Sequence, residues 1–123
     1  MKRLLITFVL IFSFLSLKAA DITSISNAFK EGNVTTLATS MDSEIDLSLS
    51  GVNEKYTGAD AIVLLDAFFK SNKPSGFTVL HHADKNETGF VVGKLPSESK
   101  EYRVNITYRA EGDKAIIQSI RIE

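Results

Sequence analysis

Apolar residues recur with a helical period in the first part of the chain and again after residue 57. Ile25 and Phe29 lie one helical turn apart, and Gly32 follows them as a stop signal. A second short helix is predicted after Asn33, where apolar residues again recur every three or four positions. The clearest helix lies in TGADAIVLLDAFFKSNKP, which ends before Pro74 and whose apolar stripe consists of Ala61, Ile62, Leu65, Phe68 and Phe69.

Elsewhere the apolar period is two, which predicts strands. The alternation in EIDLSLSG predicts a half-buried strand that ends near Gly51, and VNEKYTG predicts a turn with a short return strand. After Pro74 four segments alternate: GFTVLHHAD, TGFVVGKL, EYRVNITYRA and KAIIQSIRIE. The polar turns between them are short enough for an antiparallel meander. We expect one face of the third segment to carry Tyr102, Val104, Ile106 and Tyr108, and one face of the last to carry Ile116, Gln118, Ile120 and Ile122.

The order of these elements defines a fold class. Two short helices, one or two strands and a longer helix precede four strands. Helices segregated to one face of a curved antiparallel sheet form an α+β arrangement, which we predict for this chain. Residues 21–123 hold no repeat, linker or low-complexity tract, and we expect them to form a single domain.

Residues 1–20 have the layout of a secretory signal peptide. Lys2 and Arg3 form a basic start, a long apolar run follows, and Ala19 and Ala20 supply small residues for cleavage. Cleavage after either alanine leaves a mature chain that starts near Asp21. We therefore expect a secreted protein, located in the periplasm, with no membrane segment once the signal is removed.

The composition narrows the function classes. Without Lys2, Arg3 and Lys18 the chain holds 11 basic and 15 acidic residues, and no basic stripe stands out, so we expect no nucleic-acid partner. The absence of cysteine removes disulfides and thiolate metal ligands. We expect no cofactor and no metal site.

Three segments carry a resemblance to a known family. The stretch DAFFKSNKPSGFTVLHH, the YRV at residues 102–104 and the terminal IIQSIRIE are similar to small secreted bacterial domains of unknown function in the nuclear-transport-factor-two-like (cystatin-like) superfamily. The resemblance covers the whole mature chain and implies the cone fold, in which a cone-like curved antiparallel sheet wraps around one longer helix, with two short N-terminal helices. Its matching positions are Phe68, Phe69, Pro74, Phe77, His81, Gly93, Tyr102, Arg103, Gln118, Arg121 and Glu123.

The resemblance does not choose a function. The superfamily contains isomerases and dehydratases that work in the mouth of the cone, as well as binding domains and dimerisation modules, and no catalytic residue can be carried over from this family. Fold analogy alone does not decide among these classes.

The adjacent histidines His81 and His82 do not predict a metal site. In a strand their side chains point to opposite faces, so both cannot bind one ion from that strand. The phase of the strand is open, because both alternating sets contain apolar residues. The family resemblance favours His81 as the histidine that faces the cone.

An isomerase would also need a carboxylate or histidine inside the cone as a base. Glu44 and Asp46 fall on the polar face of their strand, so the sequence supplies no such acid inside the cone. Among the function classes considered, an enzyme therefore has the least support. The leading hypothesis is a non-catalytic domain that binds a small apolar or amphipathic ligand in the cone; the alternative is a protein-interaction or homodimerisation module that uses the outer sheet face. The expected ligand-binding residues are Phe68, Phe69, His81, Tyr102, Tyr108 and Gln118.

Overall fold

The computed structural model describes residues 21–123, so the predicted signal peptide lies outside the described part of the chain. Three helices and six strands follow one another in the order that the sequence predicts. They are α2 (Thr23–Glu31), α3 (Val34–Ala38), β1 (Met41–Leu49), β2 (Val52–Thr57), α4 (Gly58–Ser71), β3 (Thr78–Lys85), β4 (Thr88–Pro96), β5 (Glu101–Glu111) and β6 (Lys114–Ile122). None of the helices in residues 21–123 is long and apolar enough to cross a membrane.

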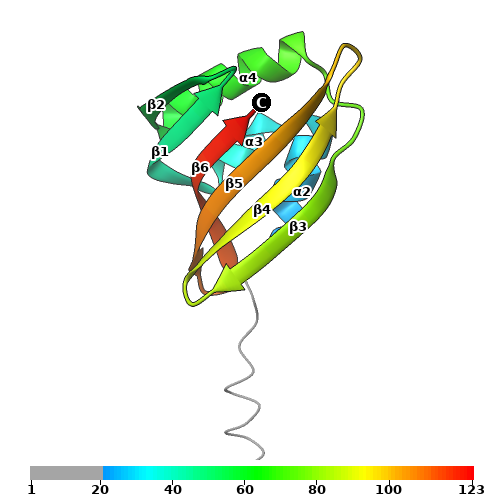
Figure 1. Ribbon diagram of the computed structural model, residues 1–123. Coiled ribbons are helices and arrows are strands. Elements are labelled where there is room, and N and C mark those ends of the chain that lie inside the picture. Colours follow the sequence, from blue (N-terminus) through cyan, green and yellow to red (C-terminus); the bar gives the residue numbers. More distant parts are fainter. Residues whose placement is uncertain (1–20) are drawn as a thin grey trace, which may run out of the picture.

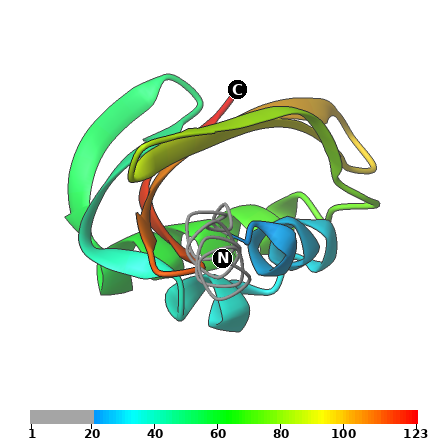
Figure 2. The same cartoon turned by 90° about the horizontal axis from the view of Figure 1, so that it is seen from below.

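The strands form one sheet with the order β2-β1-β6-β5-β4-β3 (Figure 1). The predicted sheet was fully antiparallel, and this is corrected at one pair, because β1 and β6 run parallel. The cause is topological: the β1–β2 hairpin and the β3–β6 meander are each antiparallel, and they join through their outermost strands, which point the same way. Seen from below, the sheet bends strongly around the helices (Figure 2).

Helix ends follow local capping signals. The side chain of Asn33 accepts a hydrogen bond from the Thr36 backbone N–H at 3.2 Å, and Thr57 does the same for Asp60 at 3.1 Å. Gly32 ends α2 with a positive φ of 66°, a conformation that costs glycine little. These positions confirm the predicted starts of α3 and α4 and the predicted end of α2.

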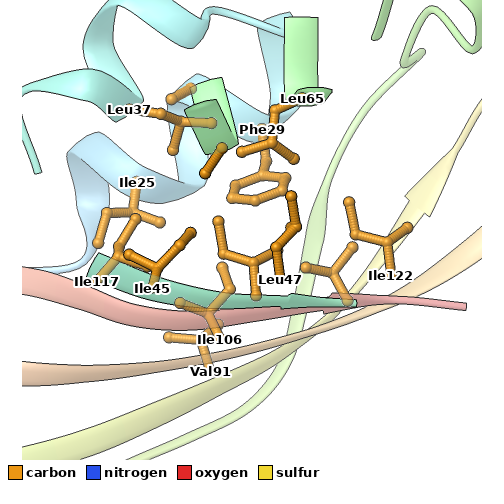
Figure 3. Packing of buried hydrophobic residues seen from close by; sticks show 14 of the residues in the cluster. Ile25, Phe29, Leu37, Ile45, Leu47, Leu65, Val91, Ile106, Ile117 and Ile122 are labelled. Atoms are coloured by element: carbon orange, nitrogen blue, oxygen red, sulfur yellow. The ribbon is translucent and has the colours of Figure 1, made fainter. Parts of the chain in front are cut away.

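The hydrophobic core lies between the helices and the concave face of the sheet (Figure 3). Phe29, Leu37 and Leu65 from the helices are fully buried, as are Ile45 and Ile106 from the strands. The buried stripe of α4 consists of Ala61, Leu65 and Phe69, as its sequence spacing predicts. This side of the sheet is called the inner face below, and the opposite side the outer face.

A bulge in β6 changes which residues reach the inner face. Ser119 pairs with Thr107 on β5, but Ile117 pairs with the next residue, Tyr108, which leaves Gln118 as the extra residue. The predicted face of Ile116, Gln118, Ile120 and Ile122 is therefore corrected. Ile120 and Ile122 are in the core together with Ala115 and Ile117, whereas Ile116 and Gln118 are not part of that cluster.

Candidate functional site

Two glycines line the inner face of β4, and aromatic rings from neighbouring segments lie over both. Gly89 pairs with Tyr108 on β5 and with Asp84 on β3, and a Cβ atom at Gly89 would stand 2.7 Å from a carboxylate oxygen of Asp84. A Cβ atom at Gly93 would stand 2.7 Å from a ring carbon of Phe77. Both glycines thus make room for side chains that reach across the strand.

Over Gly89, the hydroxyl of Tyr108 donates a hydrogen bond to the Asp84 carboxylate. Tyr108 is only 1% exposed, and burial raises the pKa of its hydroxyl, with further contributions from the hydrogen bond to Asp84 and from its negative charge. The bond joins β5 to the edge strand β3 across β4. Sequence reasoning missed Asp84, because it lies 24 residues from Tyr108 at the end of a strand.

Over Gly93, the ring of Phe77 continues into a stack of aromatic side chains. Phe77 stacks on Phe29 with 5.4 Å between ring centroids, and Phe29 meets the edge of Phe69 at 5.8 Å. These rings occupy the space between the sheet and the helices. The centre of the cone, where the sequence led us to expect a ligand, is therefore filled by the protein's own side chains.

A second aromatic cluster joins the end of α4 to the start of β5. Phe68 meets the edge of the Tyr102 ring at 5.1 Å, and the Tyr102 hydroxyl donates to the Asn72 side-chain oxygen at 2.7 Å. The Asn72 side-chain NH₂ group in turn donates to the Phe68 carbonyl at 3.1 Å, and the Lys100 ammonium lies 4.9 Å from the centre of the Tyr102 ring. We call Phe68, Asn72, Lys100 and Tyr102 the aromatic end.

The six residues expected to bind a ligand do not form one site. Phe68, Phe69 and Tyr102 come together at or next to the aromatic end, and Tyr108 lies with Asp84 beside Gly89. Gln118 is the half-buried bulge residue of β6. The remaining residue, His81, lies on the other face of the sheet.

A bulge in β3 explains the position of His81. Val79 pairs with Gly93 on the inner face, but His81 already pairs with Val92, so Leu80 is the extra residue and the phase of the strand shifts. His81 therefore lies on the outer face, where its ring centroid is 5.3 Å from that of Phe90. His82 takes the inner register position opposite Val91. The expectation that His81 faces the cone is corrected.

Four residues of β3 and β4 adjoin one another on the outer face, and we call them the outer patch. They are His81, Ala83, Phe90 and Val92. Phe90 is 36% exposed, and Leu80, next to His81 on the edge strand, is 50% exposed. The alternation of Arg103, Asn105, Thr107 and Arg109 in β5 predicts a polar outer face, and this prediction misses the half that lies on β3 and β4. The available signal was Phe90 itself, which stands between the inward positions Gly89 and Val91.

The polar half of the outer face is held by ion pairs. Arg109 donates from Nε to Asp42 at 3.3 Å and from a terminal nitrogen to Glu111 at 2.6 Å. The pKa of Asp42 is lowered by the Ser43 backbone N–H and by Arg109. Both partners are on or near the surface, so these pairs contribute little to stability.

Two open hollows lie outside the inner face of the sheet. The first, of about 350 Å³, is lined by Asp21, Ser24, Thr36, Thr39, Ser40, Asp113, Lys114 and Ala115. The second, of about 300 Å³, is lined by Glu31, Gly32, Asp66, Phe69, Lys70, Lys73 and Pro74. Within residues 21–123, no three His, Asp or Glu side chains are grouped as metal ligands.

Comparison with known proteins identifies a family whose sequence model matches this chain. The sequence model of a domain of unknown function, DUF4783, matches residues 22–123. A DUF4783 family protein from Bacteroides ovatus has a crystal structure that is similar with a TM-score of 0.80 and 28% identity over 85% of this chain and 96% of that one. One from Bacteroides fragilis gives 0.77 and 32% identity over 81% and 94%. A search among curated proteins finds no match.

More distant solved structures agree on the fold. A nuclear-transport-factor-two-like protein of unknown function from Silicibacter pomeroyi is similar with a TM-score of 0.60 and 8% identity, over 83% of this chain and 87% of that one. At this identity the likeness concerns the fold alone. The α+β fold with a curved six-stranded sheet is thus similar to the fold of that nuclear-transport-factor-two-like protein, as the sequence resemblance implies.

Proposed function

The chain belongs to the DUF4783 family of domains of unknown function, and from this premise we propose that it is a non-catalytic protein-interaction module. The partner docks on the outer patch. The observation that carries the proposal is the exposure of Phe90 on the outer face of β4, next to the edge strand β3, with the His81 ring beside it. Clustered aromatic and apolar side chains at the surface are typical of interaction sites.

The packing of the inner face favours the interaction module over the binding of a small molecule. A preformed cavity with a few polar groups is what a small-molecule site requires. Here Phe29, Phe69 and Phe77 occupy the centre of the cone, and the buried Tyr108 hydroxyl already binds Asp84. The interaction module, which ranked second on sequence grounds, therefore has the stronger support.

Secretion is part of the same proposal. Residues 1–20 carry the signal-peptide pattern. The chain contains no cysteine, so disulfide bonds give no information about its compartment. We place the interaction in the periplasm. Fractionation of cells that express the full chain, followed by mass measurement of the purified protein, tests this placement. A product that retains residues 1–20 in the cytoplasm contradicts it.

Position-specific photo-crosslinking tests the interaction function. A benzophenone amino acid replaces Ala83, which pairs with Phe90 in the outer patch, and in a matched control it replaces Val63, which is 68% exposed on α4. The proposal expects protein adducts in the producing cell from the Ala83 position and none from the Val63 position. No adduct from Ala83, or the same adducts from both positions, contradicts it.

Ligand binding is a second candidate, and one observation favours it. Phe69 contributes to the hollow of about 300 Å³ beside Lys70 and Lys73, and it contacts Phe68 of the aromatic end. An amphipathic ligand would place its apolar part on Phe69 and an anionic group near the lysines. Native mass spectrometry of the protein, before and after refolding from denaturant, tests this candidate. A mass excess that refolding removes supports it, and identical masses count against it.

A further inference from the structure

We infer that the partner at the outer patch is an extended segment of another protein, which adds as a strand to the open edge of β3. The inference rests on the interaction function proposed above and specifies the form of its partner. In the described part of the chain, β3 is the last strand at one side of the sheet and β2 at the other (Figure 1). An extended peptide that joins such an edge gains main-chain hydrogen bonds along its length.

The two edge strands differ in how they are protected. β2 carries the charged residues Glu54 and Lys55 at its middle, and the Lys55 ammonium lies 3.8 Å from the Asp46 carboxylate of β1. In β3, six of the eight residues are exposed, and none from Thr78 to Ala83 is Asp, Glu, Lys or Arg. Sheets ordinarily block an exposed edge with charges or proline. The edge of β3 has neither over this stretch, so it can accept a further strand.

The bulge in β3 limits the segment that can pair. A bulge twists an edge and interrupts regular pairing, and the extra residue here is Leu80. From His81 to Lys85 the register with β4 is regular. The accepting segment is therefore about five residues long, which is close to the usual length of a strand.

Alternation along the hairpin leaves backbone groups of two residues at the open edge. Lys85 and Thr88 flank the two-residue turn that joins β3 to β4. In an antiparallel pair, alternate residues direct their N–H and C=O groups towards the partner strand and away from it. Counted from the turn, His82 and Asp84 direct theirs away from β4. An added strand would therefore meet a donor and an acceptor at each of these residues.

The edge is already held in the conformation that a strand requires. The buried Tyr108 hydroxyl donates a hydrogen bond to the Asp84 carboxylate across β4. This bond ties β3 to β5 from the inner face and leaves the backbone of Asp84 at the edge. A binding partner therefore does not have to order β3, which reduces the entropic cost of association.

The side chains along this edge specify the residues of the partner. On the outer face the added strand lies beside His81 and Ala83, which belong to the outer patch together with Phe90. On the inner face it lies beside His82 and the Asp84 carboxylate. Apolar side chains suit the first row, and polar or basic side chains suit the second. We expect an amphipathic strand in which the two kinds alternate.

Peptides selected from a phage-displayed library of random short sequences test the inference. The target is the protein purified after expression of the full chain. The selected sequences should alternate apolar and polar residues, and binding should slow hydrogen exchange at the His82 and Asp84 amides but not in β2. A library that yields no binder, or binders that protect other amides instead, overturns the inference.

Backbone methylation of a selected peptide distinguishes strand addition from side-chain contact. An N-methyl group removes one N–H donor. In an added strand only alternate N–H groups face β3. Methylation at every second residue should therefore raise the dissociation constant at least about tenfold, and methylation at the residues between should leave it unchanged. An equal effect at all positions, or none at any, overturns the strand geometry.

A matched pair of variants tests the same edge in the protein. His82→Pro removes the N–H that faces the open edge without removing a bond to β4. His82→Thr changes the side chain and keeps the N–H. Proline should raise the dissociation constant of the selected peptide at least about tenfold, and threonine should leave it within about twofold. Equal constants for the two variants contradict the inference.

A second variant guards against a folding defect in His82→Pro. His82→Lys keeps the N–H and adds a charge beside the edge, as natural sheets do to prevent strand addition. It should weaken peptide binding by a similar factor. Circular dichroism spectra that match the unmodified protein establish that each variant is folded. Peptide binding that both folded variants leave unchanged overturns the edge of β3 as the site.

The failures of the two proposals are distinguishable by photo-crosslinking at Ala83 in these backgrounds. Adducts that are lost in His82→Pro and kept in His82→Thr support the added strand. Adducts with a different protein that persist in both backgrounds overturn the strand and retain the interaction function. Adducts that contain only a second copy of this chain overturn the assignment to another protein. No adduct from Ala83 in the unmodified background overturns both proposals.

Discussion

The inner face of β4 alternates two glycines with the buried Val91 and Leu95, whereas its outer face carries Phe90. Gly89 and Gly93 point towards the core, whereas Phe90, between them and one of the largest side chains of the strand, points outwards and is 36% exposed. Strands of half-buried sheets ordinarily place their large apolar residues inwards. The two glycines leave space on the inner face of β4, and side chains from the neighbouring segments occupy it.

The same comparison separates folding from function. Phe77 and Tyr108 fill the space over the two glycines on the inner face. Phe90 on the outer face remains 36% exposed, although its ring centroid lies 5.3 Å from that of His81. Substitutions on the two faces should therefore affect different measurements.

The largest effect is expected on the inner face at Gly93. In Gly93→Val the new Cβ atom meets the Phe77 ring and stands 3.0 Å from the Thr78 carbonyl oxygen, and the backbone cannot yield easily. We expect a loss of about 3 kcal/mol in the free energy of unfolding, measured by urea denaturation. At Gly76 the nearest atom to a Cβ is Pro96 Cγ at 3.9 Å, so Gly76→Val is the control. Equal losses in both variants would refute this account of Gly93.

A smaller loss is expected at Tyr108. Tyr108→Phe keeps the ring over Gly89 but removes the hydrogen bond to Asp84, at a cost of about 1.5 kcal/mol. Asp84→Asn, which preserves an acceptor at this position, should cost less. If Tyr108→Phe unfolds at the same urea concentration as the unmodified protein, the bond does not secure β3.

Tyr108 also predicts a dependence of stability on alkaline pH. The folded state raises the pKa of its hydroxyl above the value of about 10 that tyrosine has in an unfolded chain. The neutral form is favoured by folding, so this contribution is complete below about pH 10 and falls as the pH rises further. Thermal unfolding between pH 8 and pH 11 should show a steeper alkaline loss for the unmodified protein than for Tyr108→Phe. Parallel curves would contradict this assignment.

Tyr102 lies where the inner face of β5 reaches the surface, and its effect should be intermediate. Tyr102→Phe removes the 2.7 Å bond to Asn72 but keeps the ring contact with Phe68. Because water replaces part of the lost bond at this half-buried position, we expect a cost of about 1 kcal/mol in urea denaturation. The double variant with Asn72→Ala should cost little more than Asn72→Ala alone. Fully additive losses would show that the two residues act independently.

Local patterns predicted the helices and strands of this fold, whereas the way the strands pair depends on contacts between distant segments. The apolar stripe of α4 and the alternation in β5 depend on neighbours within a few residues, and both were predicted from the sequence. The parallel pair of β1 and β6 joins segments some 70 residues apart, and nothing in either segment specifies its direction. The family resemblance supplied the cone shape that the periodicity alone did not.

The candidate site was less predictable, because bulges in β3 and β6 decide which of their residues face the core. One extra residue at Leu80 moves His81 from the expected inner face to the outer face, and one at Gln118 displaces Ile116 from the core cluster. A bulge shifts every later side chain of its strand, and no residue type marks these two positions. The partner of Tyr108 was missed for a related reason, since Asp84 is close only when three strands are in register.

The smallest effect on stability is expected on the outer face at Phe90. Phe90→Thr replaces a partly exposed ring by a β-branched residue that suits a strand, so the free energy of unfolding at low protein concentration should change by about 0.5 kcal/mol or less. The yield of protein adducts from a benzophenone amino acid at Ala83 should nevertheless fall, because the exposed ring of the outer patch is lost. Urea denaturation and photo-crosslinking of the same variant separate the two quantities.

Gly93→Ala provides the matched comparison for Phe90→Thr, because the two residues lie three positions apart on β4 but on opposite faces. It should lower the free energy of unfolding by more than Phe90→Thr does, since its Cβ collides with Phe77, while the folded fraction should give the same adducts from the Ala83 position as the unmodified protein. A Phe90→Thr protein that is less stable than Gly93→Ala would show that the exposed ring serves the fold. The contrast between a filled inner face and an available outer face would then fail, and the interaction proposal would lose the observation that carries it.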